Sequence, residues 1–374
     1  MERQVRVLMV VFNLAVANGV SSFVMNYFRK LDHRNVIMDF VVYQEVSTPY
    51  KNEILQAGGK IYAIPSIKNL KSHLEECKRI IVNGGYDVVH DNILILSYFV
   101  MYYAKKHKVP VRILHSHNSE LGATYWKKIR NRLFLPLLRN QATDYFACSD
   151  LAATCMFGKM KYTFIPNIID GRTVRFKQEI KNRVRQELKV TNKLVVITVG
   201  RLVEQKNPFY AIDVIINLKK QNKNIEYWWI GDGPLKRNVE EYIQKKDAVS
   251  YIHLLGRRTD VIDFYQGADV FFLPSIFEGL PVTGIEAQAV GLPCFVSDAI
   301  TKEFIYTDLV EMFSLNNSPE ETADKFTQWV ARSHLDNDRT KYNKILMESK
   351  FSDQDAGKYL ESIYKKIKLH RHEI

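Results

Sequence analysis

Short apolar runs rich in β-branched and aromatic residues recur along the chain, separated by stretches of helical pattern. The first set is Val5–Val11, Val36–Tyr43, Lys60–Ile64, Tyr86–His90, Val111–His115, Thr143–Ala147 and Tyr162–Ile165, and the second is Leu194–Val199, Ile225–Ile230, Ser250–Leu254, Asp269–Leu273, Cys294–Ser297 and Val310–Ser314. This alternation predicts right-handed βαβ units around parallel sheets. Because 374 residues exceed what one core usually accommodates, we predict an α/β protein with two domains.

The character of the chain changes after Pro166-Asn167, where a charged, helix-prone stretch, Thr173–Lys189, separates the two sets of strands. We predict two Rossmann-like, doubly wound domains, residues 1–167 and 168–352, facing each other across a central cleft. Residues 353–374 are predicted as a C-terminal helix, which is a candidate to return to the first domain. Ligands of such sheets bind at the carboxyl ends of the strands.

The N-terminus has some features of a signal peptide, because Arg3 and Arg6 precede an apolar stretch that ends in Ala15-Val16-Ala17. Arg6 and Asn13 interrupt that stretch, however, and Val5 to Phe12 fits the first strand of an α/β domain. The longest apolar stretch elsewhere is Ile93–Ala104, which is too short to span a bilayer. Four cysteines without metal-site spacing fit a reducing cytoplasm.

A net charge of +12 raises the question of nucleic acid as a partner, but one segment has a marked local excess of basic over acidic residues. From Phe99 to Asn140 there are nine Lys and Arg against one acid, Glu120. Within it, residues 125–139 mix cations with bulky apolar side chains, a composition typical of a segment lying on an anionic membrane surface. A core helix with a solvated basic face is equally compatible, and Pro136 is expected to shorten any regular helix here. We expect no nucleic-acid partner.

The loop after the predicted strand Leu194–Val199 carries two cations. Arg201 lies at the tip of the strand, and Lys206 precedes Asn207 and Pro208, a predicted helix N-cap and first helical residue. A cation beside the positive end of a helix is unfavourable unless an anion is also held there. The two cations therefore suit a diphosphate, whereas the alternative is a loop with two solvated charges.

A second loop, between the strand Asp269–Leu273 and the next helix, carries two carboxylates. Glu278 belongs to the loop, and Glu286 lies about a turn and a half into a helix whose first residue is predicted to be Pro281 and which Gly291 ends. Free backbone N–H groups at such a helix start bind anions.

These motifs occur in the order Gly200 to Pro208, then Gly-Asp-Gly-Pro-Leu at 231–235, then Gly256, and then Glu278 with seven residues to Glu286. The combination resembles the nucleotide-sugar domain of family-4 retaining glycosyltransferases of the GT-B fold. The resemblance covers most of the second half of the chain, and its most specific part is the run from Glu278 to Glu286.

The resemblance implies a role for each matching residue. Arg201 and Lys206 would hold the donor diphosphate and stabilise the leaving group, Glu286 would bind the ribose hydroxyls, and Glu278 would contact the donor sugar. The backbone around Gly279, Leu280, Val282 and Thr283 would hold the distal phosphate, and the base would lie against Gly256 and Arg257. Neither glutamate needs a raised pKa, because front-face displacement replaces the two-carboxylate scheme of glycoside hydrolases. No metal ligands and no cofactor are expected, since the nucleotide sugar is a substrate.

The first half matches more loosely. Gly19, in Asn18-Gly19-Val20, occupies the place of a glycine turn that approaches the donor phosphate, although Val20 departs from the family's Gly-Gly. His115, at the tip of a strand, or His117, two residues on, is expected to face the cleft and to contact the donor sugar or the acceptor.

The segment from Ser297 to Glu303 also departs from the common pattern and resembles a subgroup found in bacterial exopolysaccharide and capsule gene clusters. We therefore expect a retaining, metal-independent hexosyltransferase that moves a sugar from a nucleoside-diphosphate sugar, most readily a UDP-sugar, to a polyprenyl-linked or other glycan acceptor. It would be cytoplasmic and peripheral at the inner face of the cell membrane. The alternatives are a nucleotide-sugar 2-epimerase of the same architecture and a binding module without activity.

Overall fold

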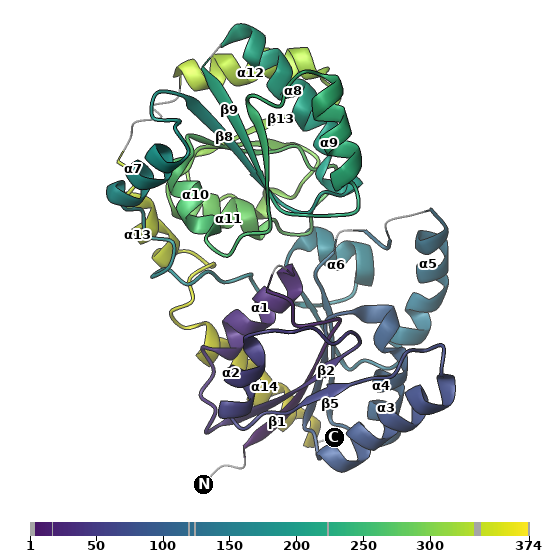
Figure 1. Cartoon of the computed structure of the whole chain (residues 1–374). Helices are drawn as coiled ribbons and strands as arrows, with labels where there is room; N and C mark the ends of the chain where they lie inside the picture. Colours follow the sequence, from purple (N-terminus) through teal and green to yellow (C-terminus); the bar gives the residue numbers. More distant parts are fainter. Residues whose placement is uncertain are drawn as a thin grey trace. The chain divides into compact units, whose positions relative to one another are not determined.

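The computed structural model describes residues 4–16, 18–118, 120–122, 125–222, 224–332 and 338–372, and they form two compact units. One unit comprises Met1–Ile168 together with Asp353–Ile374, and the other comprises Ile169–Ser352. Each unit is built on one parallel sheet with helices on both faces (Figure 1). The predicted α/β class with two Rossmann-like sheets is confirmed.

The sheet of the N-terminal unit has the strand order β3-β2-β1-β4-β5-β6-β7. Its strands are β1 Val5–Val11, β2 Val36–Val42, β3 Ile61–Ala63, β4 Val88–Asp91, β5 Val111–Ser116, β6 Asp144–Ala147 and β7 Thr163–Phe164. Its helices are α1 Gly19–Phe28, α2 Tyr50–Gln56, α3 Leu70–Gly84, η1 Leu94–Ser97, α4 Tyr98–Lys106, α5 Tyr125–Arg139, α6 Asp150–Phe157 and α14 Ala356–His372. All thirteen predicted strands of the two units are present, with bounds that shift by up to two residues.

The sheet of the C-terminal unit has the order β10-β9-β8-β11-β12-β13. Its strands are β8 Leu194–Val199, β9 Ile225–Ile230, β10 Ile252–Gly256, β11 Val270–Leu273, β12 Cys294–Ser297 and β13 Val310–Phe313. Its helices are α7 Gln178–Glu187, η2 Glu204–Lys206, α8 Pro208–Gln221, α9 Lys236–Lys245, α10 Val261–Gly267, α11 Val282–Ala289, η3 Lys302–Phe304, α12 Pro319–Arg332 and α13 Lys341–Glu348.

Strand β1 shows why these runs fold as central strands. Val5, Val7 and Met9 pack into a core on one face of the sheet with α1 and α14, whereas Leu8 and Val10 pack into a core on the other face with α3 and α4. A strand buried on both faces must be apolar throughout, which is the pattern of a parallel sheet rather than of a half-exposed one. The run that resembled part of a signal peptide is therefore the middle of a sheet, paired with β2 and β4.

Two expectations about helices are wrong in detail. Helix α5 continues through Pro136 to Arg139, because Leu135 and Leu138 are buried on the unit and hold the last turn against it, which offsets the hydrogen bond that proline cannot donate. Pro281 is the N-cap of α11 rather than its first helical residue: its ψ of 96° is extended, so the helix begins at Val282. Asn207 does precede α8, but its φ is +55° and its side chain makes no capping hydrogen bond.

The C-terminal helix α14 belongs to the N-terminal unit. Leu360 and Tyr364 are buried in the same core as α1, and Gly357 lies so close to the chain at Lys30 that a Cβ there would collide with the carbonyl oxygen of Lys30. An ion pair between Lys30 and Asp353 holds the start of this segment. Among the helices that the structure describes, none is long and apolar enough to cross a membrane.

Candidate active site

The carboxyl ends of β8 and β11 carry the charged residues that the sequence singled out. These strands are neighbours in the sheet, and the chain proceeds from β8 to β9 on one side and places β11 on the other, so this is the switch point at which such sheets bind ligands. Lys206, at the end of η2, donates to Glu278 with 2.5 Å between Nζ and Oε1, and the two side chains are only 13% and 11% exposed. The structure therefore brings together two residues that are 72 positions apart.

Arg201 differs from its predicted partner Lys206 in its surroundings. Its side chain is exposed, and it makes no hydrogen bond or ion pair with any residue that the structure describes. A free guanidinium beside a paired ammonium leaves one full positive charge at this edge, in the form best suited to bidentate contact with phosphate oxygens.

Glycines allow the loops of this edge to approach one another. A Cβ at Gly231, whose φ is +140°, would collide with the carbonyl oxygen of Gly200, and a Cβ at Gly233 would collide with that of Leu202. A Cβ at Gly200 itself would lie 2.9 Å from Cε of Lys206. The Gly-Asp-Gly-Pro motif thus exists because the turn after β9 passes directly beneath the loop that carries Arg201 and Lys206.

Gln205 is a site residue that sequence reasoning missed. Its backbone carbonyl accepts from the N–H of Ile276 at 2.8 Å, and its side-chain amide donates to the carbonyl of Phe277 at 2.9 Å. These two bonds tie the loop before Glu278 to the loop before Lys206, so they fix the ion pair between them. In the sequence, the only indication of this role for Gln205 is that it directly precedes Lys206.

The loop from Ser275 to Thr283 provides further polar groups. Gly279 and Leu280 are buried, and the hydroxyl oxygens of Ser275 and Thr283 are buried with no hydrogen-bond partner among the residues described. Val282 and Thr283 lie in the first turn of α11, where backbone N–H groups have no intrahelical acceptor. The helix start can therefore bind an anion.

Glu286 projects from the second turn of α11 and accepts a hydrogen bond from the hydroxyl of Tyr265 at 3.4 Å. Burial raises the pKa of Glu286 to about 7, although the proposed contact with the ribose does not need a raised pKa. The physical reason is that the carboxylate loses hydration at this position and gains no compensating cation among the described residues.

Arg339 is a second residue that the sequence did not reveal. Its guanidinium is buried and donates to the carbonyl oxygens of Tyr265, Ala268 and Val290 at 2.8 to 3.0 Å. It thus joins the C-terminal ends of α10 and α11, the two helices that carry Tyr265 and Glu286. A lone arginine before α13 offers no sequence signal for this role.

The predicted base-binding residues lie at the end of β10. Gly256 has a φ of +66°, and its carbonyl accepts from the N–H of Gly231 at 2.8 Å, which joins this turn to the turn after β9. Arg257 is exposed. The neighbouring Arg258 instead pairs with Asp260 at 2.7 Å and lies over the ring of Phe264.

In the N-terminal unit, Gly19 is the first residue of α1, and the side chain of Asn18 caps this helix by accepting from the N–H groups of Val20 and Ser21. A Cβ at Gly19 would meet nothing within 4 Å, so a small group can approach the backbone there. The cap was not predicted, although Asn before a helix is a common N-cap.

The two predicted histidines lie at the carboxyl end of β5 but differ in exposure. His115 is fully buried, because its ring is packed between His90 and His117 and against Phe23 and Phe146, so it does not fit its half of the alternative, contact with the donor sugar or the acceptor. His117 is half-buried, and its Nε2 lies 2.9 Å from Oδ1 of Asn92. Of the two, only His117 is placed to contact a ligand.

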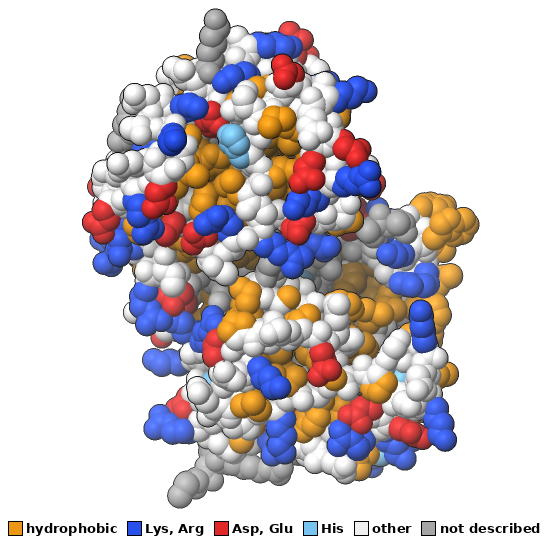
Figure 2. All heavy atoms as spheres, in the orientation of Figure 1, with side chains coloured by type: hydrophobic (Ala, Val, Ile, Leu, Met, Phe, Trp, Pro, Cys, Tyr) orange, Lys and Arg blue, Asp and Glu red, His pale blue; other side chains and the backbone are white. Residues whose placement is uncertain are grey.

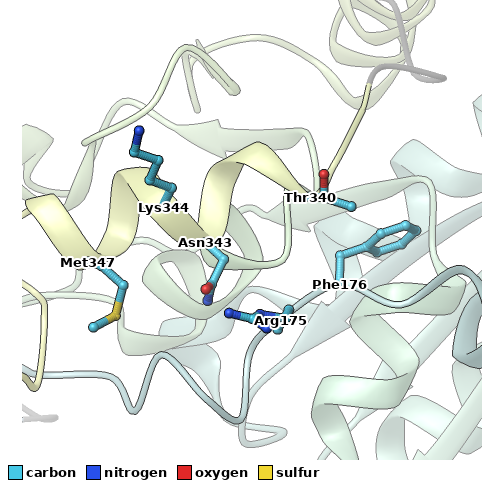
Figure 3. Close-up of a pocket in the computed structure, with 6 residues that line it drawn as sticks. All are labelled: Arg175, Phe176, Thr340, Asn343, Lys344 and Met347. Atoms are coloured by element: carbon cyan, nitrogen blue, oxygen red, sulfur yellow. The ribbon is translucent and has the colours of Figure 1, made fainter.

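A separate cavity opens in the C-terminal unit between the segment at Arg175 and Phe176 and the helix α13 (Figure 3). It is lined by Arg175, Phe176, Thr340, Asn343, Lys344 and Met347. None of the predicted site residues lines it.

Comparison with known proteins agrees with this geometry. The family model described as glycosyl transferases group 1 matches residues 179–346. The provisionally named glycosyltransferase EpsF of Bacillus subtilis is 30% identical over 302 residues, which cover 76% of this chain and 77% of EpsF. The UDP-Gal:alpha-D-GlcNAc-diphosphoundecaprenol alpha-1,3-galactosyltransferase of Escherichia coli is 28% identical over 63% of each chain.

The structure of HepE from Anabaena in complex with UDP-glucose superimposes with a TM-score of 0.78 at 14% identity, covering 96% of this chain and 99% of HepE. At that identity the likeness shows the fold alone, which is the fold predicted from the sequence. The charged edge of the C-terminal sheet, the family model that spans it, and the relative matched over three quarters of the chain lead to one conclusion: this chain belongs to the group 1 glycosyl transferases, with the GT-B fold, and is a hexosyltransferase.

Proposed function

We propose that this glycosyltransferase moves a hexose from a UDP-sugar, with retention of configuration and without a metal, to a lipid-linked glycan acceptor in exopolysaccharide or capsule assembly. The observation that carries the proposal is the pairing of Lys206 with Glu278 beside the free cation Arg201 at the carboxyl edge of the C-terminal sheet.

The arrangement suits a diphosphate leaving group. An ammonium has three donors, so Lys206 can keep Glu278 and still donate to a phosphate oxygen. Arg201 supplies a second positive charge, and the start of α11 supplies backbone N–H groups. The largely buried ammonium of Lys206 and the exposed guanidinium of Arg201 can together stabilise the developing charge of the leaving diphosphate, which is the role that a divalent metal has in other transferases.

The ribose, the hexose and the base of the donor are each assigned to different residues. Glu286 would accept hydrogen bonds from the ribose hydroxyls, Glu278 would contact the hexose, and the turn at Gly256 and Arg257 would lie against the base. Support for uridine comes from HepE, whose structures hold UDP and UDP-glucose, and from the E. coli relative, whose name gives UDP-Gal as donor.

A lipid-linked acceptor is supported by the same relative, whose acceptor is a diphosphoundecaprenol-linked sugar, and by the surface of α5. Tyr125, Trp126 and Leu133 are 71%, 76% and 71% exposed, and Figure 2 shows hydrophobic and basic side chains together over this helix. Exposed aromatic and aliphatic groups interleaved with Lys127, Lys128, Arg130 and Arg132 match an anionic bilayer surface. We propose that α5 holds the protein peripherally at the inner face of the membrane.

The activity is tested by incubating the full chain with UDP-, GDP- and ADP-sugars and a polyprenyl-diphosphate-linked sugar, and by measuring free nucleotide and glycosylated lipid. We expect UDP release that depends on the acceptor, is insensitive to EDTA and is lost in Lys206→Ala. The matched control is Lys236→Ala, which breaks an exposed Lys–Glu pair and should be silent. Conversion of the donor without acceptor would instead support an epimerase.

The membrane proposal is tested separately by flotation with vesicles of phosphatidylglycerol and phosphatidylcholine. Wild type should float with the anionic vesicles, and a variant with Glu at residues 127, 128, 130 and 132 should not. Equal flotation of the two proteins would contradict the membrane role and show that α5 is only a basic helix.

A further inference from the structure

Buried polar groups in the N-terminal unit form a continuous chain from the C-terminal helix to the end of β5. The hydroxyl of Tyr364 lies 2.7 Å from Nδ1 of His90, and Nε2 of His90 lies 3.0 Å from Nδ1 of His115. The ring of His115 then stacks on that of His117, with 4.1 Å between centroids. Tyr364, His90 and His115 are each fully buried, so water does not compete for these contacts.

We propose that Tyr364 is a positioning residue, which acts through His90 and His115 to hold the ring of His117 as an acceptor for a sugar hydroxyl. This inference rests on the proposed contact between His117 and substrate. It assigns a purpose to the return of α14 to the N-terminal unit, since Tyr364 is contributed from a position 274 residues after His90.

The tautomer of His117 follows from Asn92. The amide nitrogen of Asn92 lies 3.2 Å from the carbonyl oxygen of Val10 and 3.3 Å from that of His90. Carbonyl oxygens only accept, so the amide is oriented with Oδ1 toward His117. Nε2 of His117 must therefore carry its hydrogen, and Nδ1 is left as a lone-pair acceptor that has no partner among the described residues.

The two hydrogen bonds of the chain must run in the same direction, because each neutral imidazole has one hydrogen and one lone pair. If Tyr364 donates to Nδ1 of His90, then His90 donates from Nε2 to Nδ1 of His115 and His115 keeps its hydrogen on Nε2; in the reverse direction both rings carry their hydrogen on Nδ1. Nε2 of His115 is buried with no described hydrogen-bond partner, so the chain ends there and stacking alone transmits the arrangement to His117.

The three rings are uncharged at neutral pH. Burial lowers the pKa of His90 to about 3, and it lowers the pKa of His115 and that of His117 far below the usual value as well. Three adjacent imidazolium ions would repel one another, and two of them, on His90 and His115, would be fully buried. A neutral stack can hold a fixed set of tautomers, which is what an acceptor of defined orientation requires.

The chain is tested by ¹⁵N NMR of the full protein labelled in histidine, with each ring assigned by single His→Gln variants. In wild type, all three rings should be neutral, with hydrogen on Nε2 of His117 and on the same ring nitrogen in His90 and His115. A hydrogen on Nδ1 of His117 would overturn the inference without any variant at Tyr364.

Tyr364→Phe then removes one hydroxyl and preserves the ring. We expect shifted nitrogen signals for His90 and His115 and a kcat for transfer that falls about tenfold, because small displacements of a positioning group cost rate. The KM for the donor should not change. The matched control is Tyr359→Phe on the same helix, whose exposed hydroxyl donates to the carbonyl of Phe164 at 3.2 Å and should alter neither readout.

Unchanged nitrogen signals or an unchanged kcat in Tyr364→Phe would overturn the positioning role. Absence of transfer by wild type would instead contradict the proposed function, and the nitrogen spectra would still decide whether the chain exists.

Discussion

The carboxyl edges of the two sheets are built from opposite kinds of polar group. In the C-terminal unit the edge carries full charges, with Lys206 paired to Glu278 and Arg201 unpaired. In the N-terminal unit the corresponding edge carries imidazoles and an amide, His115, His117 and Asn92, beside the buried carboxyl of Asp91, whose pKa burial raises to about 7. The same βαβ architecture thus presents one edge with an unpaired cation suited to a diphosphate, and another whose imidazole and amide groups around His117 suit hydroxyl groups. Architecture fixes where a ligand binds, and the side chains at the strand ends fix which chemistry it has.

Among the variants of the charged edge, the largest loss of activity is expected for a substitution at Lys206. Lys206→Ala should lower kcat/KM for transfer by about two to three orders of magnitude, as expected for one lost group that stabilises transition-state charge. It should also lower the free energy of unfolding by roughly 3 to 5 kcal/mol, because Glu278 is left buried and unpaired. Steady-state kinetics and urea unfolding measure the two effects.

The double variant Lys206→Met/Glu278→Leu separates those effects. It removes both charges at once, so stability should return to near the wild-type value while activity stays low. Restored activity in the double variant would mean that Lys206 serves the fold and not the reaction.

Arg201→Ala is the next largest expected effect. Loss of one phosphate contact should lower kcat by about a hundredfold, but the free energy of unfolding should stay within about 0.5 kcal/mol of wild type, because Arg201 is exposed and its side chain makes no hydrogen bond or ion pair with the residues described. A marked loss of stability would contradict the assignment of Arg201 as a ligand-binding cation.

Glu286→Gln should have the smallest effect on rate. Unlike Lys206→Ala, it should raise the free energy of unfolding. Ribose binding needs the carboxylate, so the KM for the donor in wild type should rise as the pH falls through about 7, the raised pKa of Glu286. Glu286→Gln should weaken donor binding by about tenfold and remove this dependence.

The sign of the stability effect follows from the same pKa. A carboxyl whose pKa is raised on folding binds more protons in the native state than in the unfolded state between about pH 4.5 and 7. The folded protein therefore loses stability as the pH rises through that window. Glu286→Gln should therefore be more stable than wild type at pH 8 and gain little at pH 4. Thermal melts at the two pH values check this, and a lower melting temperature at pH 8 would contradict it.

Sequence patterns predicted the strands well because parallel strands buried on both faces, such as β1 and β8, must be apolar along their whole length. They also located Lys206 and Glu278, since both follow strands that share one edge. The pairing of these two side chains was not predictable, because it depends on the close approach of loops that Gly200, Gly231 and Gln205 permit.

Residues that act through distant contacts escaped prediction for the same reason. Arg339 donates to carbonyl oxygens at the ends of two helices, and Tyr364 contacts His90, which is 274 residues earlier in the sequence. No local sequence pattern identifies either residue. The burial of His115 was also missed, because the last residue of a strand can point into the core as readily as out of it.

The most direct test of the central claim is calorimetric titration of the full chain with UDP, GDP and ADP, repeated on Lys206→Met/Glu278→Leu. If the charged edge of the C-terminal sheet is the donor site, wild type should bind UDP through this edge, and the turn at Gly256 and Arg257 against the base should make UDP bind at least about tenfold more tightly than the other two nucleotides, a difference of about 1.4 kcal/mol. The double variant should lose most of that affinity while remaining folded. Binding of UDP by the double variant with wild-type affinity would contradict the account.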